Sequence, residues 1–169
     1  MKKIKLLFVL FAMLALGVTN AWAQTVTWEK ATSIAAGDVV VLVCESKTME
    51  LSGISTTSTK YGIGETYTST PAGKYELTVE AGSSYGTFSF KNGSAYLYWS
   101  SGNSLNKTTT KNKNASWKVT FSSGNATILN AKDNTRKLQW NASSPRFACY
   151  TGAQTAVQLY KKVISDEPA

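Results

Sequence analysis

The strongest constraint on the fold is a series of segments in which apolar and polar side chains alternate. Residues 75–80 place Tyr75, Leu77 and Val79 on one face of an extended segment and three polar residues on the other. Side chains two residues apart share a face of a β-strand, so the pattern predicts a half-buried strand. No segment after residue 23 repeats apolar residues at the spacing of a helix face, and we therefore expect no long helix.

Strands of this kind recur along the chain. Residues 38–44 are apolar on both faces, as expected of a strand that is covered on both sides. The other strands are predicted at residues 75–80, 88–90, 95–99, 117–121, 126–129, 138–140, 147–150 and 157–160. Many short strands separated by turns predict an all-β domain, either a barrel or a sandwich.

A weak internal repeat favours one particular barrel. The segment that starts at Phe88, F-S-F-K-N-G-S-A-Y-L-Y-W, parallels the segment that starts at Trp117, W-K-V-T-F-S-S-G-N-A-T-I-L-N. Each continues into a polar loop ahead of a leucine, Leu105 or Leu138, and residues 38–51 resemble a third copy. Three such units predict a single β-barrel that is β-trefoil-like, with hairpins capping a closed barrel. A β-sandwich remains the alternative.

The N-terminus has the parts of an export signal. Lys2, Lys3 and Lys5 precede an apolar run at residues 6–18, and A-W-A at residues 21–23 matches a signal peptidase site. The run falls short of the roughly 20 residues that cross a bilayer, and no later segment is apolar enough to do so. We predict a signal peptide at 1–23, an all-β domain at 24–162 and a flexible tail at 163–169. The mature protein is expected to be exported, either periplasmic or extracellular.

The residue types exclude most catalytic chemistry. Histidine is absent, and two cysteines are too few for a four-cysteine zinc site. Glu76 and Glu80 lie four residues apart on one strand, about 13 Å at strand rise, whereas glycosidase carboxylates lie about 5–10 Å apart. We therefore predict no catalytic residue, no metal site and no cofactor.

Aromatic residues suggest binding instead. With Leu97 inward, Tyr96 and Tyr98 are predicted to point outward, and so is Tyr150 if Phe147 faces inward. Exposed rings can stack on sugar rings or bury in a protein interface, and nearby amides can bind hydroxyl groups. The predicted ligand-binding residues are Tyr96, Tyr98, Trp99, Asn103, Gln139, Trp140, Asn141 and Tyr150.

The two cysteines are candidates for a disulfide. Cys44 and Cys149 lie on predicted first and last core strands, which often meet when a barrel closes. Export favours oxidation of such a pair. The alternative is that both are small buried apolar residues.

A basic loop at residues 107–118 could attract a polyanion. Only two of the 18 basic residues of the chain are arginines, however, and forked phosphate recognition favours arginine. A solvated loop is the preferred interpretation, which disfavours nucleic acid as a partner.

The C-terminal part also resembles a known group. The pattern Leu-x-x-Asn, Phe-x-Cys-Tyr and Val-x-Leu-Tyr-Lys is carried here by Leu138, Asn141, Phe147, Cys149, Tyr150, Val157, Leu159, Tyr160 and Lys161. It is similar to the end of a β-rich module of exported proteins of gut-associated bacteria, which is sometimes appended to secreted nucleases. Residues 36–41 and 96–98 are also similar. The resemblance implies a bacterial source and no particular activity, and no nuclease segment is present.

Together these features predict an exported, non-catalytic binding module that engages carbohydrate or a protein surface through exposed aromatic rings. The alternatives are a structural or host-interaction protein, such as an adhesin or assembly subunit, and a weak hydrolase.

Overall fold

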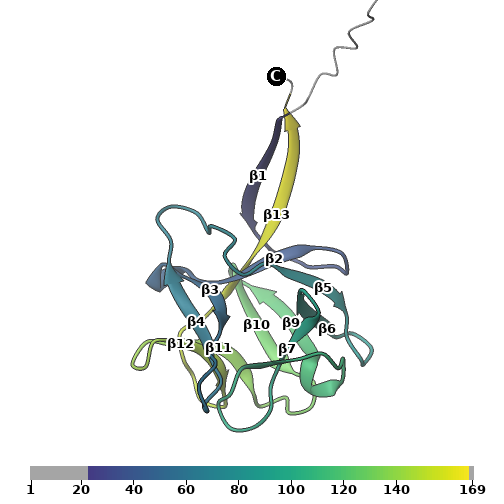
Figure 1. Ribbon diagram of the computed structural model, residues 1–169, viewed down its shortest axis with the longest axis vertical. Coiled ribbons are helices and arrows are strands. Elements are labelled where there is room, and N and C mark those ends of the chain that lie inside the picture. The colour runs from purple at the N-terminus through teal and green to yellow at the C-terminus, as the bar shows by residue number, and fades with distance from the viewer. Residues whose placement is uncertain (1–22, 168–169) are drawn as a thin grey trace, which may run out of the picture.

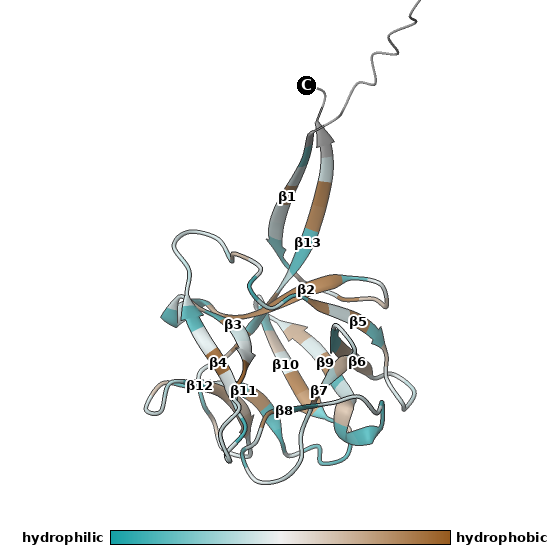
Figure 2. Ribbon diagram, viewed as in Figure 1, coloured by the Kyte–Doolittle hydropathy of each residue, from teal (hydrophilic) through white to brown (hydrophobic). Residues whose placement is uncertain are grey.

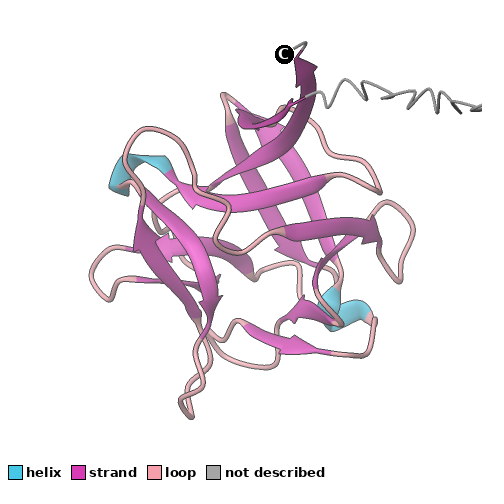
Figure 3. Ribbon diagram, turned by 45° about the horizontal axis from the view of Figure 1, so that its top comes forward, coloured by secondary structure: helices cyan, strands magenta, loops and turns pink. Residues whose placement is uncertain are grey.

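The computed structural model describes residues 23–167, and this part of the chain is all-β (Figures 1 and 3). Its helical segments are two 3-10 turns, η1 (Glu45–Lys47) and η2 (Lys113–Ala115). The predicted signal peptide at 1–23 lies outside the described residues except for Ala23, which begins the first strand. The strands are β1 (Ala23–Lys30), β2 (Val39–Cys44), β3 (Met49–Ile54), β4 (Gly62–Thr66), β5 (Leu77–Ala81), β6 (Phe88–Asn92), β7 (Ala95–Tyr98), β8 (Asn106–Thr108), β9 (Trp117–Ser122), β10 (Asn125–Asn130), β11 (Lys137–Asn141), β12 (Arg146–Tyr150) and β13 (Gln158–Glu167).

Six of these strands close into a barrel. The ring runs β2, β5, β6, β9, β10, β13 and back to β2, each neighbour being antiparallel. The link between β10 and β13 is a single bridge between Ala126 and Val157. The remaining strands of the barrel domain form three hairpins, β3–β4, β7–β8 and β11–β12. Each four-strand unit thus gives its first and last strands to the barrel and its middle two to a hairpin, which is the β-trefoil arrangement. The β-trefoil prediction is confirmed and the sandwich alternative is excluded.

The two similar segments found in the sequence begin at different places within their four-strand units. The segment at Phe88 covers β6 and β7, the first two strands of the second unit, and residues 38–51 cover the same places in the first unit. The segment at Trp117 covers β9 and β10, the last strand of the second unit and the first strand of the third. Both are two strands joined by a tight turn, and such a local pattern does not distinguish where a unit starts.

One leucine from each hairpin anchors it in the core. Leu51, Leu97 and Leu138 lie on β3, β7 and β11, the second strand of each unit, and each is at most 2% exposed. They belong to one apolar cluster that includes the fully buried rings of Trp117 and Phe90. Burial of a leucine of this kind stabilises a fold by about 1.5–3 kcal/mol.

Strand β2 is buried on both faces, as predicted for residues 38–44. Val40 and Leu42 point into the barrel cluster, whereas Val41 and Val43 form a second cluster with Tyr67 on the outside. Figure 2 shows β2 as one of the most hydrophobic strands of the molecule. Trp28 and Tyr160 pack over this outer cluster and exclude water from it.

The first and last strands form a ribbon that projects from the barrel (Figure 1). β1 and β13 pair without a break from Ala23 opposite Glu167 to Lys30 opposite Tyr160. The predicted flexible tail at 163–169 is therefore strand as far as Glu167, and residues 168–169 lie outside the described part. Val26 and Ile164 are direct cross-strand partners on this ribbon, and such pairs stabilise an antiparallel ribbon.

Two glycines on β4 allow the hairpins to pack closely. A Cβ on Gly62 would lie 2.6 Å from Leu51 Cδ1, and a Cβ on Gly64 would collide with the ring of Trp140. Strand β4 also pairs with β12 through Gly62 and Phe147. The side chains of the β11–β12 hairpin therefore rest directly on the backbone of β4.

Gly64→Ala tests this contact. Overpacking against the Trp140 ring should lower the free energy of unfolding by about 1–3 kcal/mol, measured by chemical denaturation. Gly152→Ala is the matched control, because nothing lies within 4 Å of a Cβ at that position. Equal stability of the two variants would contradict the close packing of β4 on β11.

Candidate functional site

Backbone hydrogen bonds join the three hairpins to one another. The connecting segments are residues 55–61, 99–105 and 142–145. Leu105 N donates to Lys60 O at 3.0 Å, and Cys149 N donates to Asn103 O at 3.4 Å. The first segment is also closed at its base, because Tyr61 N donates to Ser55 Oγ at 3.0 Å and Ser55 N donates to Tyr61 O at 2.8 Å. The ends of the β3–β4 and β7–β8 hairpins are therefore joined, and the second of them is held against strand β12.

A pocket of about 240 Å³ opens between these ends, and we call it the hairpin pocket. Every hairpin contributes to it, and its side chains are polar or aromatic. They are Thr59, Lys60, Tyr61, Asn103, Asn141, Ser144, Arg146 and Tyr150.

Asn141 organises one wall of the hairpin pocket. Its Oδ1 accepts hydrogen bonds from the backbone N of Ser143 and of Ser144, both at 3.0 Å, and so holds the β11–β12 turn. Its Nδ2 donates to the hydroxyl of Tyr150 at 3.1 Å. The Tyr150 hydroxyl is consequently fixed at the pocket although the residue is only 8% exposed.

Arg146 makes a contact between strand β12 and the β3–β4 hairpin. Its guanidinium lies over the ring of Tyr61, 4.6 Å from the ring centre, in cation–π geometry. Its Nε donates to Ser144 O at 3.2 Å, and its Nη2 donates to Ser144 Oγ. These contacts hold the planar guanidinium in one orientation beside the β11–β12 turn.

The structure brings together Asn103, Asn141 and Tyr150 of the predicted binding residues. Trp99 lies beside the pocket but does not line it. Its indole N donates to Gly102 O at 2.9 Å, and Arg136 lies 5.6 Å from its ring centre. Arg136 Nη1 in turn donates to Asn103 Oδ1 at 3.0 Å, which links Trp99 to the pocket wall.

Trp140 and Tyr96 are predicted as exposed binding residues, but the structure buries both. Trp140 is 2% exposed and packs edge-on against Phe147, with ring centres 4.8 Å apart. Tyr96 points out of the barrel, but it is only 9% exposed, because the amines of Lys91 and Lys111 lie over its ring. Tyr98 is half-buried on β7, away from the pocket lining.

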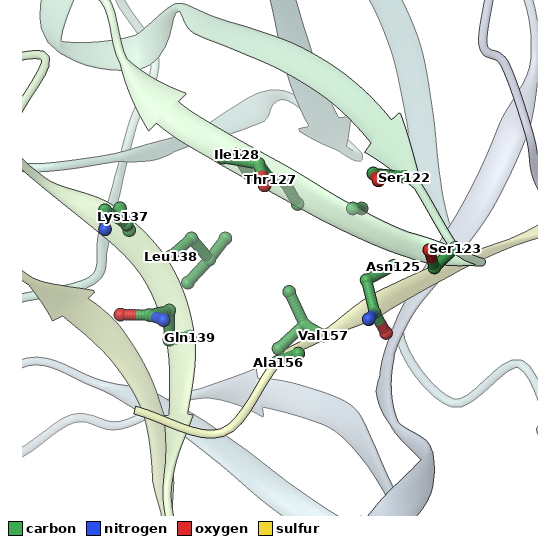
Figure 4. A pocket seen from close by; sticks show the side chains of 11 residues that line it. Ser122, Ser123, Asn125, Thr127, Ile128, Lys137, Leu138, Gln139, Ala156 and Val157 are labelled. Carbon is green, nitrogen blue, oxygen red and sulfur yellow. The ribbon is translucent and has the colours of Figure 1, made fainter. Parts of the chain in front are cut away.

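Gln139 lines a different cavity, the side pocket, of about 310 Å³. This cavity lies where β10, β11 and the start of β13 diverge. In Figure 4 Leu138 and Val157 face each other across it, and Asn125 and Gln139 lie on opposite sides. Gln139 Nε2 donates to Gln154 O at 3.5 Å. Of the predicted binding residues, only Gln139 lines the side pocket.

The pocket residues that sequence reasoning did not select are Thr59, Lys60, Tyr61, Ser144 and Arg146. Most of them lie in loops, where alternation gives no information. One usable signal was available: arginine occurs only twice in the chain. Both arginines stack on an aromatic ring at or beside the hairpin pocket.

Glu76 and Glu80, the carboxylates considered as hydrolase candidates, both form ion pairs with lysines. Glu76 accepts from Lys162 Nζ at 2.8 Å, and Glu80 pairs with Lys91 at 3.1 Å and with Lys111 at 2.6 Å. Hydrogen bonds from Lys111 and Lys91 lower the pKa of the Glu80 carboxyl to about 2. A carboxyl with so low a pKa is a poor general acid at neutral pH.

Within residues 23–167 no three His, Cys, Asp or Glu side chains gather in a way that could hold a metal ion. No helix in this part of the chain has the length and apolar character needed to cross a bilayer.

Cys44 and Cys149 are free and buried, so of the two alternatives the structure shows small buried residues and not a disulfide. The strand that closes the barrel against β2 is β13, whereas Cys149 lies on β12, in a hairpin. β3 and β4 separate β2 from β12 in the sheet order. Burial raises the pKa of both thiols, so neither is activated as a nucleophile.

Comparisons with known proteins identify the fold and no family. No protein-family description and no curated protein matches the sequence. Polyporus squamosus lectin, solved with a human-type influenza-binding epitope, has a TM-score of 0.57 and 12% identity over 79% of this chain and 50% of its own. A GlcNAcα1-4Gal releasing endo-β-galactosidase from Clostridium perfringens has a TM-score of 0.56 and 11% identity over 73% of this chain and 32% of its own.

The designed 3-fold symmetric protein ThreeFoil has a TM-score of 0.53 and 13% identity over 74% of this chain and 97% of its own. The present chain thus spans half of the lectin and about a third of the galactosidase, but nearly all of ThreeFoil. At such identities the likeness shows a shared fold alone.

The ion pairs of Glu80 predict an acid-dependent loss of stability. The pKa of its carboxyl falls from 4.5 to about 2 on folding, so its stabilising effect is complete above pH 4.5 and is lost as the pH falls towards 2. The difference in unfolding free energy between wild type and Glu80→Gln should shrink over this range. A difference that stays constant from about pH 6 to about pH 2 would contradict the assignment. Lys91→Met with Lys111→Met should remove the same acid dependence.

The state of the cysteines is tested by alkylation and intact mass. Protein unfolded without reductant should take up two alkyl groups, and native protein should take up none because both thiols are buried. A reduced and unfolded sample gives the reference mass. An unreduced, unfolded sample that remains unlabelled would show a Cys44–Cys149 bond.

Proposed function

We propose that the protein is an exported, non-catalytic module that binds a glycan in the hairpin pocket. The observation that carries the proposal is the convergence of Asn103, Asn141, Tyr61 and Tyr150 from three hairpins into one pocket. Amide and hydroxyl groups can donate to and accept from sugar hydroxyls, and an aromatic ring can pack against the apolar face of a sugar. The side pocket has no aromatic residue in its lining.

The pocket is organised before a ligand arrives. Asn141 is fixed by two backbone donors and by Tyr150, and the backbone of Asn103 is fixed by Cys149. Groups that are already ordered lose little side-chain entropy on binding, so more of the contact energy becomes affinity. This arrangement supports binding at a rigid site.

Binding rather than catalysis is supported by the chemistry of the lining. The eight residues that line the hairpin pocket include no carboxylate and no cysteine. A glycosidase requires carboxyl groups on either side of the scissile bond. Proteins with the same fold include both a lectin and an endo-β-galactosidase, so the proposal depends on the residues of this pocket and not on the fold.

Export is supported by the position of the predicted cleavage site. Ala23 and Gln24 lie at the end of the β1–β13 ribbon, at its pairing with Glu167 and Asp166. The ribbon projects from the barrel (Figure 1), so cleavage there would leave the barrel and hairpin pocket unchanged. The resemblance to modules of exported bacterial proteins agrees with this interpretation.

The function is tested on a glycan array with residues 24–169, followed by titration of the strongest binder. Asn103→Ala and Tyr61→Ala should each weaken binding by about tenfold, as expected from the loss of a hydrogen bond or a ring contact. Gln139→Ala, in the side pocket, is the matched control and should bind as wild type does.

Two results would overturn the glycan proposal. One is the absence of binding across a broad array by folded protein. The other is the reverse pattern, in which Gln139→Ala loses binding and both hairpin-pocket variants retain it.

A further inference from the structure

The hairpin pocket carries positive charge and no negative charge in its lining. Lys60 and Arg146 are its two charged residues, and the other lining side chains are neutral amides, hydroxyls and phenols. They come from different hairpins, Lys60 from residues 55–61 and Arg146 from the start of β12. The two cations therefore face one cavity from separate parts of the chain.

Neither cation has a carboxylate partner among the side chains that the structure describes. The ion pairs within residues 23–167 join Lys30 to Glu45, Lys74 to Glu65, Lys91 and Lys111 to Glu80, Arg136 to Asp133, Lys161 to Asp38 and Lys162 to Glu76. None of these pairs involves Lys60 or Arg146. Lys60 Nζ donates to Thr56 O at 2.9 Å, and the Arg146 guanidinium donates to Ser144.

Arg146 retains hydrogen-bond donors for a ligand. A guanidinium has five N–H groups, and the bonds to Ser144 use Nε and one N–H of Nη2. The stack on Tyr61 and the bonds to Ser144 fix the plane of the group. A fixed, planar guanidinium matches the geometry of a carboxylate, which can accept two parallel N–H bonds.

We infer that the hairpin pocket selects a saccharide that bears a carboxylate, such as a uronic or a sialic acid residue. Arg146 binds the carboxylate, Lys60 adds a second positive charge, and the pocket amides and the Tyr150 hydroxyl contact the sugar hydroxyls. This inference rests on the proposed glycan binding and adds the chemical class of the ligand. Its basis is the pair of cations without a carboxylate partner in a pocket lined by sugar-binding groups.

The test compares each acidic saccharide with its methyl ester, which keeps the sugar and removes the charge. The probes are immobilised oligogalacturonate and sialic acid-terminated oligosaccharides, each presented as acid and as ester. Wild-type protein should bind at least one acid about tenfold more tightly than its ester, as expected for a charge-assisted hydrogen bond. Arg146→Gln should bind the acid and the ester alike, and Lys60→Gln should show a smaller preference for the acid than wild type does.

Lys118→Gln is the matched control, because Lys118 is exposed on β9 outside the pocket. It removes the same charge and should leave the preference for the acid unchanged. Lys60→Gln also guards against a folding defect in Arg146→Gln, since the Lys60 side chain bonds only to a backbone carbonyl in its own loop. Thermal unfolding of each variant confirms that it is folded.

Three outcomes would overturn the inference. If acid and ester bind equally well to wild type, the pocket binds glycans without selecting acids, and the proposed function stands. If sulfated saccharides bind as tightly as carboxylates and Lys118→Gln weakens both, the attraction is a general effect of net charge. If no saccharide binds in either form, the proposed function fails together with the inference.

Discussion

Burial of three leucines, one from each hairpin, is the interaction on which the rest of the structure depends. Leu51, Leu97 and Leu138 lie in one cluster with the interior of the barrel. A hairpin that lost this anchor would expose apolar surface and leave its partner strands without a packing surface. Because all three hairpins are anchored around the same cluster, their ends are forced together. The hairpin pocket is a consequence of that convergence.

Close packing of the β4 backbone against side chains of its own and the neighbouring hairpin then fixes how the hairpins lie relative to one another. Gly62 and Gly64 let β4 lie directly on Leu51, Phe147 and Trp140. Backbone hydrogen bonds from Leu105 to Lys60 and from Cys149, on β12, to Asn103 complete the contact between the hairpins. The polar side chains of the pocket are thus placed by the main chain and by the core beneath them, and they need little rearrangement to meet a ligand.

Sequence alone predicted the fold better than the site. Alternation located most barrel strands because their burial is one-sided and periodic, and the continuous apolar run located β2, which is buried on both faces. Strands β4 and β8, G-I-G-E-T and N-K-T, carry no apolar pattern and depend on pairing. Alternation also places Trp140 on the inward face beside Leu138, so its burial was predictable. The covering of Tyr96 was not, because alternation does not specify where Lys91, its partner across the β6–β7 turn, and Lys111, in the loop before η2, place their amines. Tyr61, in a loop, and Arg146, at the start of β12, meet only in three dimensions.

The central claim is that three hairpin ends form one rigid pocket, and amide hydrogen exchange of the ligand-free protein tests it most directly. The amide protons of Leu105 and Cys149 bridge the hairpins. They should exchange as slowly as those of barrel strand β2, because opening them requires the hairpins to separate from the core. Exchange of both at the rate of an exposed loop, with β2 still protected, would show that the hairpin ends move independently and that no fixed pocket exists.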